Sequence, residues 1–181
     1  MDIRTAQYQD YERIAHLHAT SWKTYYRDIL GQEYLEQEVD EDRQLIWQTR
    51  LTNPPFNQHV LLVEDDHELL GFICLFGNHD FEKGTIIESL HITPTHRGQG
   101  LGKLLIQNSL PWVKQFFPMS GVYLEVMEKN HQAVDFYDHI GGSHHFDRDW
   151  RSPCGNIIHE WVYTWESPDE LAKAIDEPMS A

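Results

Sequence analysis

The sequence has few cysteines, no long apolar run and few basic side chains. Its two cysteines, Cys74 in an apolar run and Cys154 in a Pro-Gly turn, form neither a disulfide framework nor a metal knuckle, so we expect two free thiols. No apolar stretch approaches the roughly 20 residues of a membrane helix. The first residues also lack the apolar core of a secretory signal. We therefore expect a cytoplasmic protein that does not bind membranes.

The shortage of basic residues gives the chain a strong negative charge. Fourteen Lys and Arg stand against 29 Asp and Glu, for a formal net charge of -15. Such a charge repels phosphate backbones, so we expect no nucleic-acid partner. It favours cationic partners, although acidity also serves solubility alone. The twelve histidines form no metal motif, and the neighbours His144 and His145 would point to opposite faces of a strand, so we expect no metal.

The length of 181 residues is typical of one domain, and no internal repeat or linker divides it. We expect a single domain over 1–181, with a C-terminal helix and tail over 166–181. In the first half the patterns predict a strand over 2–5 and a helix that Asp10 can cap. A second helical stretch is expected over 32–51. Three β-rich runs follow over 60–64, 69–76 and 84–93, with turns at 65–67 and 77–80, as in an antiparallel meander.

The second half alternates helices and strands. A glycine-rich loop leads into a helix that begins at Leu101 and that Pro111 should kink or shorten. A strand over 122–126, a helix capped by Asn130, two strands over 144–150 and 157–165 and a helix over 168–175 complete the chain. This order predicts an α/β fold with a mixed sheet.

The loop between the strand over 84–93 and the next helix has the character of an anion site. A strand that ends in a glycine-rich loop before a helix presents free backbone N–H groups and the positive end of the helix dipole. A P-loop would need glycine at position 97 and Ser or Thr at position 104, where this sequence has Arg97 and Leu104. A dinucleotide fingerprint would need glycine at position 103, which is Lys103. The spacing therefore excludes both motifs. A glycine-rich turn without a ligand is the alternative.

The loop and the strand before it resemble a known family. The sequence Arg97-Gly98-Gln99-Gly100-Leu101-Gly102 fits the pattern Arg-x-x-Gly-x-Gly and follows Leu90-His91-Ile92-Thr93-Pro94. Both are similar to the GNAT superfamily of acyl-CoA-dependent N-acetyltransferases. The resemblance implies a mostly antiparallel sheet of about seven strands, flanked by helices, with a cofactor cleft where the central strands splay. It also implies that the amides of residues 97–102 hold the coenzyme pyrophosphate, with charge added by Arg97 and Lys103 and with Leu90, His91 and Ile92 beside the cofactor.

Two further segments add to the resemblance. Residues 124–137 look like the family's next strand and helix, which implies that Asn130 bonds the pantetheine or phosphate arm and that Tyr137 lies near the coenzyme sulfur. Taken alone, the two residues read as a helix cap and a core tyrosine. Residues 21–30 resemble the family's first helix, which implies that Trp22, Tyr25 and Tyr26 touch the acceptor; packing in the core or at its rim is equally open.

Direct acetyl transfer needs a neutral amine, so a base or a water chain must remove a proton from the ammonium form. Glu88 is the first candidate, because many family members place an acidic residue there. Glu125 is the second, because some protein N-terminal acetyltransferases place their base there. Both can equally be solvated strand residues. The family's strand bulge implies a backbone N–H near His91 or Ile92 as the donor to the oxyanion.

The resemblance therefore implies an N-acetyltransferase that uses acetyl-CoA, without a metal, and acts on a primary amine. Acidity favours a small cationic amine or a polyamine. Protein N-termini or lysines and aminoglycosides are alternative acceptors, and a non-catalytic acyl-CoA sensor is the alternative from another class. Monomer or homodimer, and the use of longer acyl-CoAs, stay open.

Overall fold

The computed structural model describes residues 1–177, so the end of the predicted C-terminal tail, residues 178–181, lies outside the described part of the chain. Within residues 1–177 the strands are β1 Asp2–Thr5, β2 Gln58–Asp65, β3 Glu68–Asp80, β4 Gly84–Ile92, β5 Val122–Met127, β6 Ser143–Arg151 and β7 Ile157–Trp165. The helices are α1 Tyr11–Tyr25, α2 Gln32–Gln37, α3 Val39–Thr52, α4 Leu101–Phe116, α5 His131–His139 and α6 Pro168–Asp176, with short 3₁₀ turns η1 Tyr8–Asp10 and η2 Pro94–His96. Across these residues, no helix has the length and apolar character that crossing a bilayer requires.

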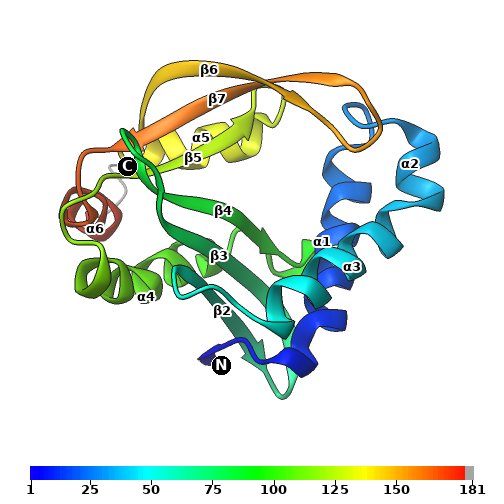
Figure 1. The fold of residues 1–181 in the computed structure, drawn as a ribbon, viewed down its shortest axis with the longest axis horizontal. Helices are drawn as coiled ribbons and strands as arrows, with labels where there is room; N and C mark the ends of the chain where they lie inside the picture. Colours follow the sequence, from blue (N-terminus) through cyan, green and yellow to red (C-terminus); the bar gives the residue numbers. More distant parts are fainter. Residues whose placement is uncertain (178–181) are drawn as a thin grey trace.

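The strands of this part of the chain form one seven-stranded sheet in the order β1-β2-β3-β4-β5-β7-β6 (Figure 1). Every neighbouring pair is antiparallel except β4 and β5. These two are parallel, and the crossover between them contains α4, as parallel neighbours require. The sheet confirms the predicted fold class, a mixed and mostly antiparallel sheet flanked by helices.

The parallel pairing of β4 with β5 is very short. Only two residues of β4, Thr85 and Ile86, have partners on β5. Just before them, Gly84 has a φ of +92°, and a Cβ there would lie 2.3 Å from the carbonyl oxygen of Gly121. The Thr85 amide donates a hydrogen bond of 2.9 Å to that same oxygen. Beyond Ile86 the ladder stops and the two central strands separate, as the resemblance implied.

Helices cover both faces of the sheet (Figure 1). On one face α1 and α3 pack against strand side chains that include Leu62 and Phe72. On the other face α4, α5 and α6 enclose a larger core that includes Leu61, Ile73 and Leu105. Leu61 and Leu62 belong to different cores because successive side chains of a strand point to opposite faces. The apolar run of β2 is therefore explained by burial on both sides.

The structure refines three predicted details of the elements. The helical stretch expected over 32–51 is confirmed and consists of two helices, since Glu38 separates α2 from α3. The turn expected at 77–80 belongs to β3, which runs to Asp80 through an irregular register at Asn78, whose φ is +45°. Of the two effects expected of Pro111, a kink or a shortened helix, shortening does not occur, because α4 continues to Phe116. Local preference predicts a turn at residues 77–80 and a helix end near Pro111, and tertiary packing overrides that preference here.

The two predicted helix caps behave differently. Asp10 stands directly before α1 but does not cap it. Its carboxylate instead accepts a hydrogen bond of 2.7 Å from the Gln7 amide and forms ion pairs with Arg4 and Arg13 at 2.8 and 2.7 Å. Asn130 is confirmed as a cap, since its side chain accepts a hydrogen bond of 3.4 Å from the backbone N–H three residues later.

The contact between Gly84 and Gly121 predicts a large effect of one methyl group. Gly84→Ala would combine left-handed backbone strain of about 1–2 kcal/mol with an overpacking cost of about 1–3 kcal/mol. Gly155→Ala is the matched control, because Gly155 also has a positive φ, +88°, but nothing lies within 4 Å of its Cβ position. In urea unfolding, Gly84→Ala should lose clearly more stability than Gly155→Ala. Equal losses would show that the approach to Gly121 costs nothing.

Candidate active site

A cavity of about 1000 Å³ occupies the opening between β4 and β5. Residues from α1, α3, α4, α5 and the four strands β4 to β7 line it. Most predicted site residues lie on its wall: Trp22, Tyr26, Glu88, Leu90, His91, Ile92, Arg97, Gly98, Gly100, Leu101, Gly102, Lys103, Glu125, Asn130 and Tyr137. Tyr25 and Gln99 are not among the lining residues. The part lined by the glycine loop, α4 and α5 is called the loop half below, and the part lined by α1, α3, β6 and β7 is called the acceptor half.

The glycine loop has the backbone shape of an anion cradle. Gly98 and Gly100 have φ values of +76° and +81°, and no atom lies within 4 Å of either Cβ position. Gly100 is the N-cap of α4, so the first N–H groups of this 16-residue helix point out of its end toward the loop. Positive helix-end charge, free N–H donors and the open space above both glycines fit a phosphate group.

Arg97 joins this loop to α1. Its guanidinium carbon lies 3.2 Å from the centroid of the Tyr25 ring, and its Nη1 donates a hydrogen bond of 3.0 Å to the side-chain oxygen of Gln132 on α5. Burial lowers the pKa of Arg97 from its ordinary value, while the nearby tyrosines oppose that change. Tyr25 therefore supports Arg97 from behind the cavity wall. This contact differs from the direct touch on the acceptor that the resemblance implied.

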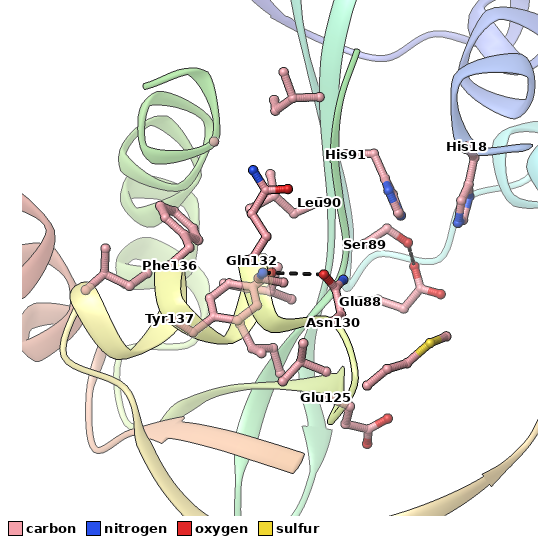
Figure 2. Close-up of a pocket in the computed structure, with 18 of the residues that line it drawn as sticks. His18, Glu88, Ser89, Leu90, His91, Glu125, Asn130, Gln132, Phe136 and Tyr137 are labelled. Carbon is pink, nitrogen blue, oxygen red and sulfur yellow. Dashed lines mark hydrogen bonds between the residues drawn. The ribbon is translucent and has the colours of Figure 1, made fainter. Parts of the chain in front are cut away.

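Tyr137 and Asn130 lie on one side of the opening. In Figure 2, Asn130 lies between Tyr137 and Glu88. Burial, helped by the neighbouring Tyr26, raises the pKa of the Tyr137 phenol well above its ordinary value. Burial also raises the pKa of Tyr26 to about 12, although Arg97 and a hydrogen bond with Asn130 act against it. Both phenols therefore keep their protons at neutral pH and can act as donors.

Glu88 faces the acceptor half from an irregular point of β4. Cys74 of β3 pairs with Ser89 and the next residue of β3 pairs with Ile87, so Glu88 itself is the bulged residue. The bulge expected near His91 or Ile92 is thus displaced toward Glu88. It turns the carboxylate out of the regular ladder and toward the cavity (Figure 2).

The Glu88 carboxylate is already paired. Arg50 on α3 donates two hydrogen bonds to it, at 3.0 and 2.8 Å, and the Ser89 hydroxyl donates a third. Burial acts to raise the pKa of Glu88, but the charge and hydrogen bonds of Arg50 outweigh it and leave that pKa below its ordinary value. A carboxylate that is ionised and whose charge is balanced by an arginine can position other groups, but it accepts a proton poorly.

Two histidines lie beside Glu88 in the acceptor half. The rings of His91 on β4 and His18 on α1 have centroids 4.5 Å apart, and Figure 2 shows them side by side. Burial, together with the charge of Arg97, lowers the pKa of His91 to about 4. Burial also holds the pKa of His18 well below its ordinary value, and the Trp47 indole N–H donates a hydrogen bond of 3.0 Å to its Nδ1. His18 is therefore neutral with its hydrogen on Nε2.

A second group of charges crosses β5, β7 and β6. Arg148 on β6 makes an ion pair with Glu125 on β5, and its Nε lies 3.6 Å from Oε1 of Glu160 on β7. The Glu160 side chain is 10% exposed, and its Oε1 has no hydrogen-bond partner within the described residues. Burial, with the nearby charge of Glu125, raises the pKa of Glu160 to about 7. The proton equilibrium of Glu160 thus lies near neutral pH.

An aromatic and cationic wall closes the acceptor half. Trp22 of α1 is buried against Tyr26 and Trp150, with ring centroids 5.9 and 6.0 Å away. The guanidinium carbon of Arg43 on α3 lies 4.2 Å from the centroid of Trp22. Trp22 and Tyr26 therefore both line the cavity.

Six residues of the acceptor half were not predicted from the sequence, namely His18, Arg43, Arg50, Arg148, Trp150 and Glu160. Period-two alternation could have placed Glu160 and Ile158 on one face of β7. Nothing local in the sequence joins α3 to the cavity. Over residues 1–177, no group of three or more His, Cys, Asp or Glu side chains is arranged to hold a metal ion.

The fold and sequence resemble those of known acetyltransferases. In a stretch of 79 residues the chain is 37% identical to the peptidyl-lysine N-acetyltransferase YjaB of Salmonella typhimurium, covering 44% of this chain and 46% of that protein. The matched region spans less than two thirds of the curated relatives it matches. The structure of PaiA N-acetyltransferase from Thermoplasma acidophilum in complex with coenzyme A superposes with a TM-score of 0.69 at 21% identity, covering 88% of this chain and 96% of that one.

A second solved structure extends the range of named acceptors. A chimera of the spermidine N-acetyltransferase SpeG from Vibrio cholerae and hSSAT has a TM-score of 0.64 at 17% identity, covering 94% of this chain and 99% of that one. The family model of the Acetyltransferase (GNAT) family matches residues 14–141, which include the glycine loop, Asn130 and Tyr137. The chain therefore belongs to the GNAT acetyltransferase family.

Proposed function

We propose that the protein transfers the acetyl group of acetyl-CoA directly to a primary amine. The observation that supports this most strongly is one cavity with an anion cradle and a phenol donor in its loop half and three carboxylates, Glu88, Glu125 and Glu160, in or beside its acceptor half. The named acceptors of the similar proteins, peptidyl lysine and spermidine, both present primary amines. Protein N-termini and aminoglycosides present amines as well.

The loop half would hold the donor. The amides of residues 97–102 would bind the pyrophosphate, with Lys103 and Arg97 supplying positive charge. Asn130 would bond the pantetheine arm, and the edge of β4 from Leu90 to Ile92 would lie alongside it. A backbone N–H of that edge would meet the oxyanion.

Two residues would move protons. The base takes one proton from the acceptor ammonium, and the neutral nitrogen then attacks the thioester carbonyl, so that a C–N bond forms and the C–S bond breaks. Tyr137 donates its phenolic proton to the leaving sulfur and regains one that the acylated nitrogen releases. Its raised pKa keeps the proton in place until the sulfur becomes negative.

The structure favours a different division of work among the carboxylates from the one that the resemblance suggested. Arg50 neutralises Glu88 and Arg148 neutralises Glu125, so we propose that these two orient the acceptor and the arginines. Glu160 has a pKa near the working pH, which a general base needs. We propose that it accepts the ammonium proton, through a water where the amine lies closer to Glu125.

Release of free thiol from acetyl-CoA tests the proposal as a whole. The panel of amines should contain a lysine peptide, spermidine, an aminoglycoside and small amines of each charge type. For an enzyme, the rate of thiol release should increase with the concentration of one class of amine. A binding module, the alternative from another functional class, would bind acetyl-CoA in calorimetry and release thiol with none of them.

The cradle predicts that Gly100→Val weakens coenzyme A binding. A side chain at Gly100 would enter the open space above the loop, and lost hydrogen bonds to a charged group should lower affinity about 10- to 100-fold. Gly155→Val controls for backbone strain, because Gly155 shares the positive φ and lies outside the cavity lining. Calorimetry with folded Gly100→Val that gave unchanged affinity would rule out this loop as the phosphate site.

The role of Tyr137 predicts a loss of turnover without a loss of binding. Tyr137→Phe keeps the ring and deletes the proton donor, so turnover should fall roughly 100-fold, with coenzyme affinity and thermal stability nearly unchanged. Steady-state and stopped-flow thiol assays measure this. Equal turnover of both proteins where chemistry limits the rate would leave Tyr137 as a packing residue.

The base proposal predicts the shape of the pH profile. Below about pH 7 Glu160 holds a proton and cannot accept another, so kcat/KM should rise with pH to an inflection near 7 and then level off. Glu160→Gln should lower kcat/KM about 100-fold at pH 8 and remove the inflection. Glu88→Gln and Glu125→Gln are the comparison variants. An inflection that persists in Glu160→Gln and vanishes in either of the other two would transfer the role of base to that residue.

A further inference from the structure

The carboxylates that face the acceptor half all have cationic neighbours. Arg50 holds Glu88 at 2.8 Å, and Arg148 pairs with Glu125 and lies 3.6 Å from Glu160. A polycationic acceptor would need carboxylates free to meet each of its charges. Although the whole chain has a formal charge of -15, this part of the cavity therefore offers little uncompensated negative charge.

Arg43 is a buried cation that takes no part in these pairs with the cavity glutamates. Its side chain is 7% exposed, lines the cavity and stacks on Trp22. One nitrogen, Nη2, bonds the Asp42 carboxylate at 3.0 Å. Nε is buried without a hydrogen-bond partner, and no hydrogen bond from Nη1 occurs within residues 1–177. A buried guanidinium with donors to spare is costly unless an acceptor group meets it.

His18 adds a second donor on the same wall. Its Nδ1 accepts the Trp47 indole hydrogen, so only Nε2–H is left for a ligand, and no hydrogen bond from Nε2 occurs within the described residues. The ring lines the cavity and lies against Trp22, with centroids 5.0 Å apart. The same Trp22 therefore holds the guanidinium of Arg43 and the imidazole of His18 in fixed positions.

We propose that the acceptor amine also carries a carboxylate, as an amino acid does, and that Arg43 and His18 bind this carboxylate. This inference rests on the proposed function. A single negative charge matches Arg43, the buried cavity cation whose Nε and Nη1 donate no hydrogen bond within residues 1–177. A phosphate would bring a second negative charge close to Glu88, Glu125 and Glu160, and like charges at such range are unfavourable. The amine end would then extend toward the opening between β4 and β5.

Matched acids and amides test the carboxylate directly. The acceptors are L-lysine, glycine, β-alanine, 4-aminobutyrate and 6-aminohexanoate, each compared with its own carboxamide, and with cadaverine for lysine. Varying the chain length finds the spacing between carboxylate and amine. For the best acid, kcat/KM should exceed that of its amide about 10- to 100-fold, the range for hydrogen bonds to a charged group, and the difference should lie mainly in KM.

Arg43→Gln should bring this acid-to-amide ratio close to one, with the affinity for coenzyme A within about twofold of that of the original protein. Arg43→Lys, which keeps the charge and loses the planar fork, should give an intermediate ratio and also serves if the glutamine variant fails to fold. Lys114→Gln is the matched control for the loss of one positive charge, since Lys114 lies on α4 outside the cavity lining.

Different results would overturn the carboxylate site and the proposed N-acetyltransferase activity. Transfer to the amides, to cadaverine or to a lysine peptide with no preference for any acid would overturn the carboxylate site and leave the N-acetyltransferase intact. So would an acid preference that survives unchanged in both Arg43 variants. If acetyl-CoA binds but none of the amines causes release of thiol, the proposed function itself would be overturned.

Discussion

The two-residue parallel pairing of β4 with β5 is the constraint on which the site depends. A longer ladder would close the opening, and a missing one would leave the two halves of the sheet unconnected. The contact of Gly84 with Gly121 sets where pairing begins, because the two backbones meet there without side chains, and pairing ends after Ile86 and Tyr123. From that point β4 turns its carboxyl-terminal edge to the loop half, and β5 turns Glu125 to the acceptor half. The cavity is therefore a property of the sheet, and the helices around it supply its chemistry.

The electrostatics of the cavity differ from those of the whole molecule. The large negative charge is spread over the surface, where water and salt screen it. Inside the cavity, arginines from α3 and β6 form ion pairs with the glutamates of three strands, and burial shifts the pKa values of several titratable groups. The same desolvation that raises the pKa of Glu160 lowers that of His91, because it opposes the charged form in each case. Local arrangement, more than net charge, thus determines which ligands the site suits.

The parts of the site that the sequence predicted are those encoded in short segments. The glycine loop, the Asn130 cap and the helical position of Tyr137 each depend on residues within about one helical turn. Arg43 and Glu160 could not be predicted, because their roles come from packing α3 and β7 against strands far away in the sequence. Asp10 shows the same limit in another form: its residue type and place suit a helix cap, but two arginines and the Gln7 amide compete successfully for its carboxylate. The split of the 32–51 stretch likewise leaves no clear mark in its pattern.

The stacking of Arg97 on Tyr25 connects the regions proposed for the two substrates at a point away from the reacting atoms. Arg97 belongs to the loop that suits the donor phosphates, whereas Tyr25 belongs to the helix that carries Trp22 and Tyr26 on the acceptor wall. A donor that draws the guanidinium toward its phosphates also acts on α1, and an acceptor that settles α1 acts on the guanidinium. Thermodynamic reciprocity requires the two effects to be equal, so each ligand changes the affinity for the other by the same factor. This single contact provides a physical basis for an ordered or synergistic encounter of the two substrates.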